Sequence, residues 1–190
     1  PEIVREIKRR GHKIFLDLKL HDIPNTVGRS MAVLSGLDVD ICNLHAAGGS
    51  EMMRAAVKGL TREDGSRPLL IAVTMLTSID EERMNGELGI RGSLPDTVMK
   101  YALCARDSGL DGVVCSPLEA QAVHETCGES FLTVTPGIRF SGGAEGDQKR
   151  VTTPARAREI GSDYIVVGRP ITAAADPVEA YRRCVREFLG

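Results

Sequence analysis

The chain has 190 residues, of which 42% are hydrophobic and 26% charged, and its formal net charge at pH 7 is -2. This length suits one domain with a full hydrophobic core, and the near-neutral charge argues against a nucleic-acid-binding protein. No apolar run approaches the roughly 18 residues that a transmembrane helix needs, so we expect no membrane association.

The cysteines argue for a reduced protein. There are five of them, an odd number, and none forms a C-x-x-C pair. Cys42 and Cys115 lie inside apolar runs, as small buried hydrophobic residues do. We therefore expect a cytoplasmic location, with neither a disulfide framework nor a zinc site.

Six short apolar runs predict β-strands, at residues 14–18, 41–45, 69–75, 112–115, 131–135 and 164–168. They are rich in Val and Ile and show little polar alternation. This is typical of strands buried on both faces of a parallel sheet.

Helical patterns separate these runs, and most carry capping signals. We expect helices over 2–10, 25–34 and 95–107, and further helices that begin after Gly48-Gly49, Ser116, Thr153 and Asp176. The last of these has an apolar face made by Val178, Tyr181, Val185 and Phe188. Two longer loops, 77–94 and 139–153, directly follow strands.

The regular alternation of strand and helix predicts an α/β fold. A doubly wound sheet and a (β/α)₈ barrel both fit this pattern. A barrel typically has about 250 residues and eight strand–helix units, whereas this chain offers six units and a helix before the first. With no linker in the sequence, we expect residues 1–190 to form a single domain.

The stretch 17–26, DLKLHDIPNT, is the first candidate for chemistry. Asp17 and Lys19 are two residues apart behind an apolar run, so on a regular strand they would point to the same side. Asp22 follows just past the strand. Such charges beside a buried strand are costly unless they are paired or used. The alternative is a structural ion-pair network at the rim of the sheet.

Polar residues also follow the other predicted strands, at the edge where parallel α/β enzymes bind ligands. Gly168 and Arg169 come after the last strand, where they would suit a phosphate; the alternative is an ordinary turn. The loop 139–150 is interpreted as a lid that carries Arg139 and Gln148, or else as a simple surface loop. His45 is more simply a core histidine than a catalytic one.

Seven sequence blocks resemble those of the orotidine 5′-monophosphate decarboxylase family, in its bacterial form. They are FLDLKLHDIPNT, NLHAAGG, LLIAVTMLTS, DGVVCS, TVTPGIR, GDQKR and VVGRPIT, in this order. The D-x-K-x-x-D element alone would identify only the wider superfamily. The six further blocks make the resemblance specific.

The resemblance implies a (β/α)₈ barrel that works as a homodimer, with active sites at the subunit interface. Lys19 would stabilise and then protonate the carbanion at C6 of the substrate orotidine 5′-monophosphate, giving UMP, and Asp17 would hold Lys19 in place. Asp22 and Thr26 would reach across the interface. The family uses no metal or organic cofactor.

The resemblance also assigns substrate contacts. The segment after Asp22 would bind substrate, and Thr77 and Ser78 would lie at its ribose and pyrimidine end. Four further residues would bind the 5′-phosphate. The implied substrate-binding residues are therefore Ile23, Pro24, Asn25, Thr26, Thr77, Ser78, Arg139, Gln148, Gly168 and Arg169.

One departure from the family pattern matters. The family has an Asp on its first strand and a Lys on its second, and this chain begins in the helix after the second. We therefore expect a barrel that lacks its first two strands, and we expect these 190 residues alone to be inactive. The alternative functions are a magnesium-dependent sugar-phosphate decarboxylase or aldolase of the same superfamily, and an inactive nucleotide-binding fragment.

Overall fold

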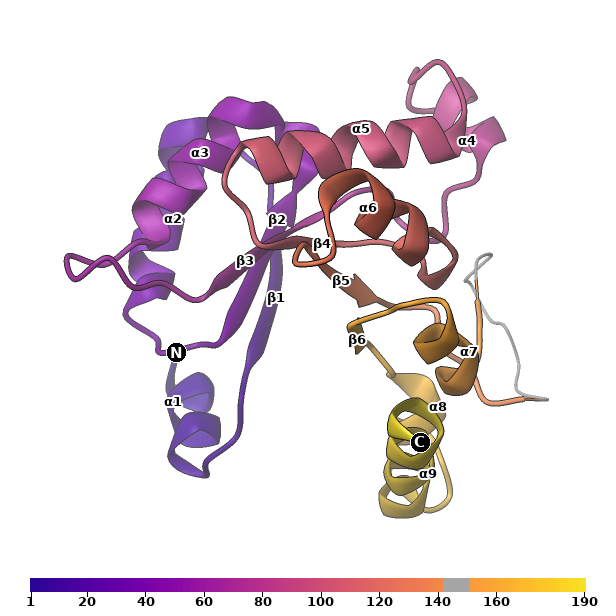
Figure 1. Ribbon diagram of the computed structural model, residues 1–190. Helices are drawn as coiled ribbons and strands as arrows, with labels where there is room; N and C mark the ends of the chain where they lie inside the picture. Colours follow the sequence, from indigo (N-terminus) through magenta and orange to yellow (C-terminus); the bar gives the residue numbers. More distant parts are fainter. Residues whose placement is uncertain (142–150) are drawn as a thin grey trace. The chain divides into compact units, whose positions relative to one another are not determined.

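The computed structural model describes residues 1–141 and 151–190 (Figure 1). The chain divides into two compact units. Unit 1 comprises residues 1–74 and 100–113, and unit 2 comprises residues 75–99 and 114–190. Helix α5 (Leu94–Asp107) and strand β4 (Gly112–Val114) each carry residues of both units.

Unit 1 is built on three parallel strands in chain order. Strand β2 pairs with β1 on one side and with β3 on the other. The elements of this unit before α5 are α1 (Glu2–Arg9), β1 (Phe15–Leu20), α2 (Pro24–Ser35), β2 (Ile41–His45), the 3₁₀ turn η1 (Ala46–Gly48), α3 (Gly49–Leu60) and β3 (Leu69–Val73). The predicted order of strands and helices is confirmed here.

Helices α2 and α3 lie side by side in this unit (Figure 1). They approach so closely that a Cβ atom added to Gly59 would lie 2.1 Å from the carbonyl oxygen of Gly28. Met31, Met52 and Met53 are completely buried in the same core. This packing fixes helix α2, and with it the DIPNT segment where the helix begins.

Unit 2 contains the parallel pair β5 (Leu132–Thr135) and β6 (Tyr164–Ile165). Its helices other than α5 are α4 (Glu81–Gly86), η2 (Pro117–Glu119), α6 (Ala120–Cys127), α7 (Pro154–Glu159), α8 (Arg169–Thr172) and α9 (Pro177–Leu189). The predicted capping box is present: the Ser116 hydroxyl accepts from the Leu118 N–H, and Glu119 accepts from the Ser116 N–H. The Thr153 and Asp176 side chains cap α7 and α9.

Two short helices were not predicted. Helix α4 lies inside the stretch 77–94 that was expected to be a loop, where the Asp80 carboxylate caps it and Met84 is buried. Helix α8 is a single turn that begins at Arg169, and β6 ends at Ile165, three residues earlier than expected. Such short elements carry too few residues for a hydrophobic period to be recognised.

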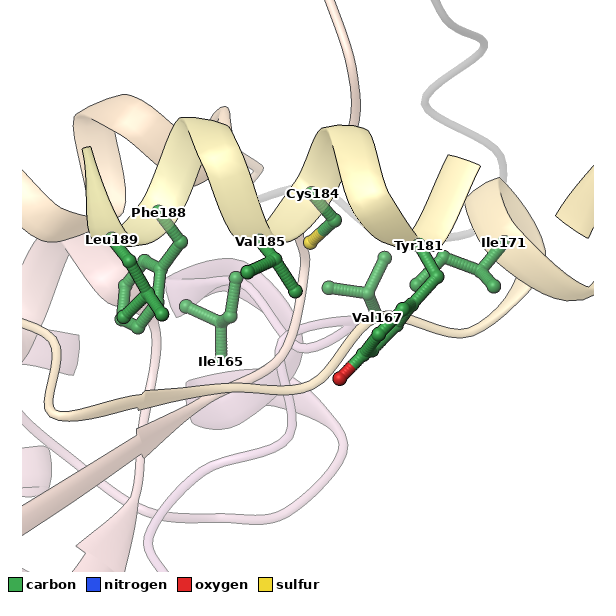
Figure 2. A pocket seen from close by; sticks show the side chains of 8 residues that line it. All are labelled: Ile165, Val167, Ile171, Tyr181, Cys184, Val185, Phe188 and Leu189. Carbon is green, nitrogen blue, oxygen red and sulfur yellow. The ribbon is translucent and has the colours of Figure 1, made fainter. Parts of the chain in front are cut away.

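An apolar cavity of about 420 Å³ lies between α9 and the segment of β6 and α8 in unit 2. Figure 2 shows the α9 side chains Tyr181, Val185 and Phe188 turned toward Ile165 and Val167. The predicted apolar face of α9 is thus confirmed for those three residues. Every side chain that lines this cavity is apolar or a tyrosine or cysteine, so it offers no cation for a phosphate.

Four of the five cysteines are buried, and Cys104 is half-buried. All five lie in the described residues and none is in a disulfide. Burial raises the pKa of the Cys42 thiol to about 12, with Arg67 opposing and Asp111 reinforcing the shift. Cys42 therefore stays protonated at neutral pH and packs as an apolar side chain. Among the helices of the described residues, none has the length and apolar character needed to cross a membrane.

One carboxylate organises the start of the unit 1 sheet. The Asp40 side chain accepts the backbone N–H of Ile14 at 2.7 Å and the Lys8 ammonium at 3.1 Å, tying α1 and the approach to β1 to the residue before β2. Partial burial acts to raise the pKa of Asp40, but the two hydrogen bonds and the positive charges of Lys8 and Lys13 outweigh it, so the pKa is lowered from 3.8.

We predict that Asp40→Asn lowers the free energy of unfolding by about 1–2 kcal/mol at pH 7, because the ion pair of the carboxylate with Lys8 is lost and its hydrogen bond with the Ile14 N–H is no longer charge-assisted. A lowered folded-state pKa stabilises the fold above the unfolded-state pKa, and this contribution disappears as the pH falls through the folded value. Urea unfolding at pH 7 and at pH 2 measures it, and the two proteins should converge at pH 2. The matched control is Asp38→Asn, whose carboxylate is 83% exposed. An equal effect of both substitutions would contradict the prediction.

Candidate active site

Strand β1 ends irregularly at the residue expected to carry the chemistry. The register with β2 shifts between Leu16 and Leu20, and Lys19 lies in the left-handed region with a φ of 51°. A non-glycine residue adopts this conformation at a cost of about 1 kcal/mol or more. Local interactions must therefore hold the backbone there.

The side chains of Asp17 and Lys19 meet directly. The Lys19 ammonium lies 2.6 Å from both carboxylate oxygens of Asp17. The side chain of Lys19 is 39% exposed and that of Asp17 is 46% exposed, so a ligand can reach both. The expectation that they lie side by side is correct, but the cause is different. The regular alternation of a strand is broken at Lys19, and the kink brings the ammonium to the carboxylate.

A buried asparagine joins this pair, and the sequence interpretation missed it. Asn43 of β2 is 1% exposed; its side-chain oxygen accepts the backbone N–H of Lys19 at 2.8 Å. Its amide nitrogen donates to Asp17 at 2.7 Å. The available signal was a polar residue in the middle of an otherwise apolar strand, because buried polar groups need hydrogen-bond partners.

Two histidines lie beside the same strand ends. The rings of His21 and His45 are 5.5 Å apart between centroids. Burial lowers the pKa of His45, the positive charges of His21 and Lys19 lower it further, and Asp17 opposes them. His45 is half-buried rather than enclosed in the core, and its imidazole is neutral at pH 7.

The DIPNT segment forms the start of α2. The Asp22 carboxylate accepts the N–H of Ile23 at 2.7 Å, and Pro24 is the first residue of the helix. Asn25 and Thr26 follow in the first turn and are exposed. A shallow hollow of about 530 Å³ here is lined by His21, Asp22, Ile23, Pro24, Ala47 and Gly48.

The remaining predicted residues belong to unit 2. Thr77 is buried and Ser78 half-buried in the segment that follows β3. Gly168 is the residue before α8, and the exposed Arg169 is the first residue of that helix.

Arg139 follows β5. Its backbone N–H donates to the carbonyl of Thr152 at 2.9 Å, and the N–H of Thr152 donates to the carbonyl of Gly137. The two ends of the predicted lid are therefore joined. Gln148 and the rest of that loop lie in 142–150, outside the described residues.

Comparison with known proteins adds to this geometry. The orotidine 5′-phosphate decarboxylase / HUMPS family matches residues 1–184. The chain belongs to this family. The orotidine 5′-phosphate decarboxylase of Bacillus cereus strain G9842 is 55% identical over 193 aligned residues, which cover 100% of this chain and 81% of the relative.

Two solved structures support the same family and its fold. An orotidine 5′-phosphate decarboxylase from Lactobacillus acidophilus is 44% identical with a TM-score of 0.86, covering 100% of this chain and 81% of that one. An uncharacterized conserved protein from Geobacillus kaustophilus is 49% identical with a TM-score of 0.85, covering 99% and 81%. The predicted (β/α)₈ barrel fold of the family is confirmed. The described residues supply six of its eight strands.

Proposed function

We propose that this protein decarboxylates orotidine 5′-monophosphate to UMP and CO₂, a step of pyrimidine biosynthesis. The observation that carries the proposal is the contact between the Lys19 ammonium and Asp17 at the kinked end of β1, in a chain that belongs to the decarboxylase family. The pair is accessible to a ligand, and its lysine is fixed in a strained backbone position.

The chemistry requires a cation at one carbon atom. When the C6–carboxylate bond breaks, its electron pair stays on C6 and CO₂ leaves. An ammonium held where this charge develops stabilises the transition state without needing to reorganise. Lys19 then donates one proton to C6, which gives UMP and a neutral amine, and the amine regains its proton from water.

Asp17 has two tasks in this proposal. Its two oxygens hold the Lys19 ammonium from one side, which fixes the direction of the Nζ–H bonds. Its charge also lies beside the carboxylate that the substrate loses. The neutral imidazole of His45 adds no second cation to compete with Lys19.

The family resemblance assigns the 5′-phosphate and the nucleoside of the substrate to six further residues. Arg169 and the backbone of Gly168, together with Arg139 and Gln148, suit the 5′-phosphate, because a guanidinium can donate two parallel hydrogen bonds to it. Thr77 and Ser78 suit the hydroxyl and carbonyl groups of the nucleoside. Binding energy from the phosphate would be used to orient the pyrimidine at Lys19.

The proposal includes a homodimer with shared active sites. Asp22 and Ile23 are exposed together at the start of α2, and Ile23 is 66% exposed. An acid and a large apolar side chain in this position suit burial against a second subunit. Asp22 and Thr26 would then complete the partner's site. The five cysteines, none in a disulfide, suit a cytoplasmic enzyme.

We predict that Lys19→Met in the complete gene product lowers kcat by about 10⁴-fold or more, because both the cation and the proton donor are removed. Methionine keeps the aliphatic stem, so the binding of UMP should change by less than about tenfold. The release of CO₂ from orotidine 5′-monophosphate measures kcat, and calorimetry measures UMP affinity.

The same assay separates the alternatives. Wild-type turnover that survives extensive treatment with EDTA would support the proposal, and turnover that needs added magnesium would favour the sugar-phosphate enzymes. A Lys19→Met variant with near-normal kcat would contradict the assigned mechanism.

We predict complementation between two inactive variants if the sites are shared. In a mixture of Lys19→Met and Asp22→Ala chains, half of the dimers are heterodimers, and each has one intact site. Activity should therefore recover to about a quarter of the wild-type value. The control mixture, Lys19→Met with Asp17→Ala, should recover nothing, because both residues serve the site of their own chain. No recovery in the first mixture would refute the shared site.

A further inference from the structure

We propose that Asn43 is a positioning residue that sets the backbone of Lys19 and the carboxylate of Asp17 at the same time. The inference rests on the proposed decarboxylase function and deepens it. Asn43 is buried, so it does not reach the substrate itself. It acts through the two residues that do.

The orientation of the Asn43 amide is determined by its partners. A backbone N–H can only donate, so the side-chain oxygen of Asn43 must face Lys19, at 2.8 Å. An ionised carboxylate can only accept, so the amide nitrogen must face Asp17, at 2.7 Å. The oxygen and the nitrogen of the Asn43 amide therefore each face the partner that they can bind.

The hydrogen bond to Lys19 is made at the strained residue. The left-handed φ of 51° turns the Lys19 N–H out of the regular ladder between β1 and β2, where the register shifts. A part-buried N–H left without a partner would destabilise this backbone conformation. The Asn43 oxygen replaces the missing strand partner and so stabilises the conformation that directs the ammonium to Asp17.

The hydrogen bond to Asp17 restricts the other half of the pair. One Asp17 oxygen receives both the Asn43 amide and the Lys19 ammonium, at 2.7 and 2.6 Å. Because Asn43 belongs to the central strand of the unit 1 sheet, its amide has little freedom to move. The carboxylate is thus anchored on a rigid element, and the lysine follows it.

The sharpest test is Asn43→Asp, which keeps the shape and the acceptor for the Lys19 N–H but replaces the donor to Asp17 by a carboxylate oxygen. The two facing carboxylates repel each other unless they share a proton. We expect kcat at pH 7 to fall by about 100-fold, because the Lys19 ammonium is displaced. KM should change by less than about threefold, because the residues that bind the phosphate are not affected.

The pH profile distinguishes positioning from simple packing. Relative to wild type, the loss in Asn43→Asp should shrink as the pH is lowered and one proton bridges the pair. The other titratable groups around it are Lys19, His21 and His45, which both proteins share. Asn43→Ala removes both hydrogen bonds, and its loss should be equally large at every pH.

Cys42→Ala is the matched control. Cys42 is the neighbouring buried residue of β2, its side chain points to the opposite face, and it packs against Met31 of α2. Its kcat should remain within about threefold of wild type. The assays use the complete gene product, and if Asn43→Ala does not fold, the isosteric Asn43→Asp still decides the question.

The outcomes are separable from those of the proposed function. An inactive wild-type enzyme would contradict the decarboxylase function itself. An active wild type whose Asn43→Asp variant keeps its kcat, or loses it by the same factor at all pH values, would overturn the positioning role of Asn43.

Discussion

The site depends on one hydrogen bond, from the backbone N–H of Lys19 to the buried amide oxygen of Asn43. It holds a lysine in a left-handed conformation that the residue would otherwise avoid. The resulting kink interrupts the regular pairing of β1 with β2, which resumes at Leu20, and it brings the ammonium to Asp17. Because the same asparagine also binds Asp17, the two charges are placed by one residue on a central strand. Strain at this position is thus coupled directly to the geometry of the Asp17–Lys19 pair.

The packed core of unit 1 stabilises this arrangement. The close approach of Gly28 and Gly59 fixes α2 against α3, and Asp22 lies two residues before the first residue of α2. The segment from His21 to Pro24 therefore connects two rigid elements, β1 and α2. Because the segment is short, its backbone has little freedom to move. A strained strand end and a tightly packed helix determine where the acids and the lysine lie.

Much of the fold could be predicted from the sequence, because its signals are local. Apolar runs without alternation indicated parallel strands, and Ser116, Thr153 and Asp176 indicated helix starts. The pairing of Asp17 with Lys19 was also predicted, but from the regular alternation of a strand. In the structure, the kink at Lys19 brings the two side chains together instead. Asn43 could not be assigned in this way, since its partners lie 24 and 26 residues away and only the register of β1 with β2 brings them together. The short helices α4 and α8, of six and four residues, were missed because so few residues show no detectable hydrophobic period.

The most direct test of the central claim, that Lys19 delivers the proton to C6, is the exchange of the C6 hydrogen of UMP in D₂O. By microscopic reversibility, the neutral amine of Lys19 should remove this hydrogen and the deuterated ammonium should return deuterium. Proton NMR follows the loss of the C6 signal. The account predicts exchange in the wild-type enzyme and a loss of about 100-fold or more in its rate in Lys19→Met. Exchange at the same rate in both proteins would contradict it.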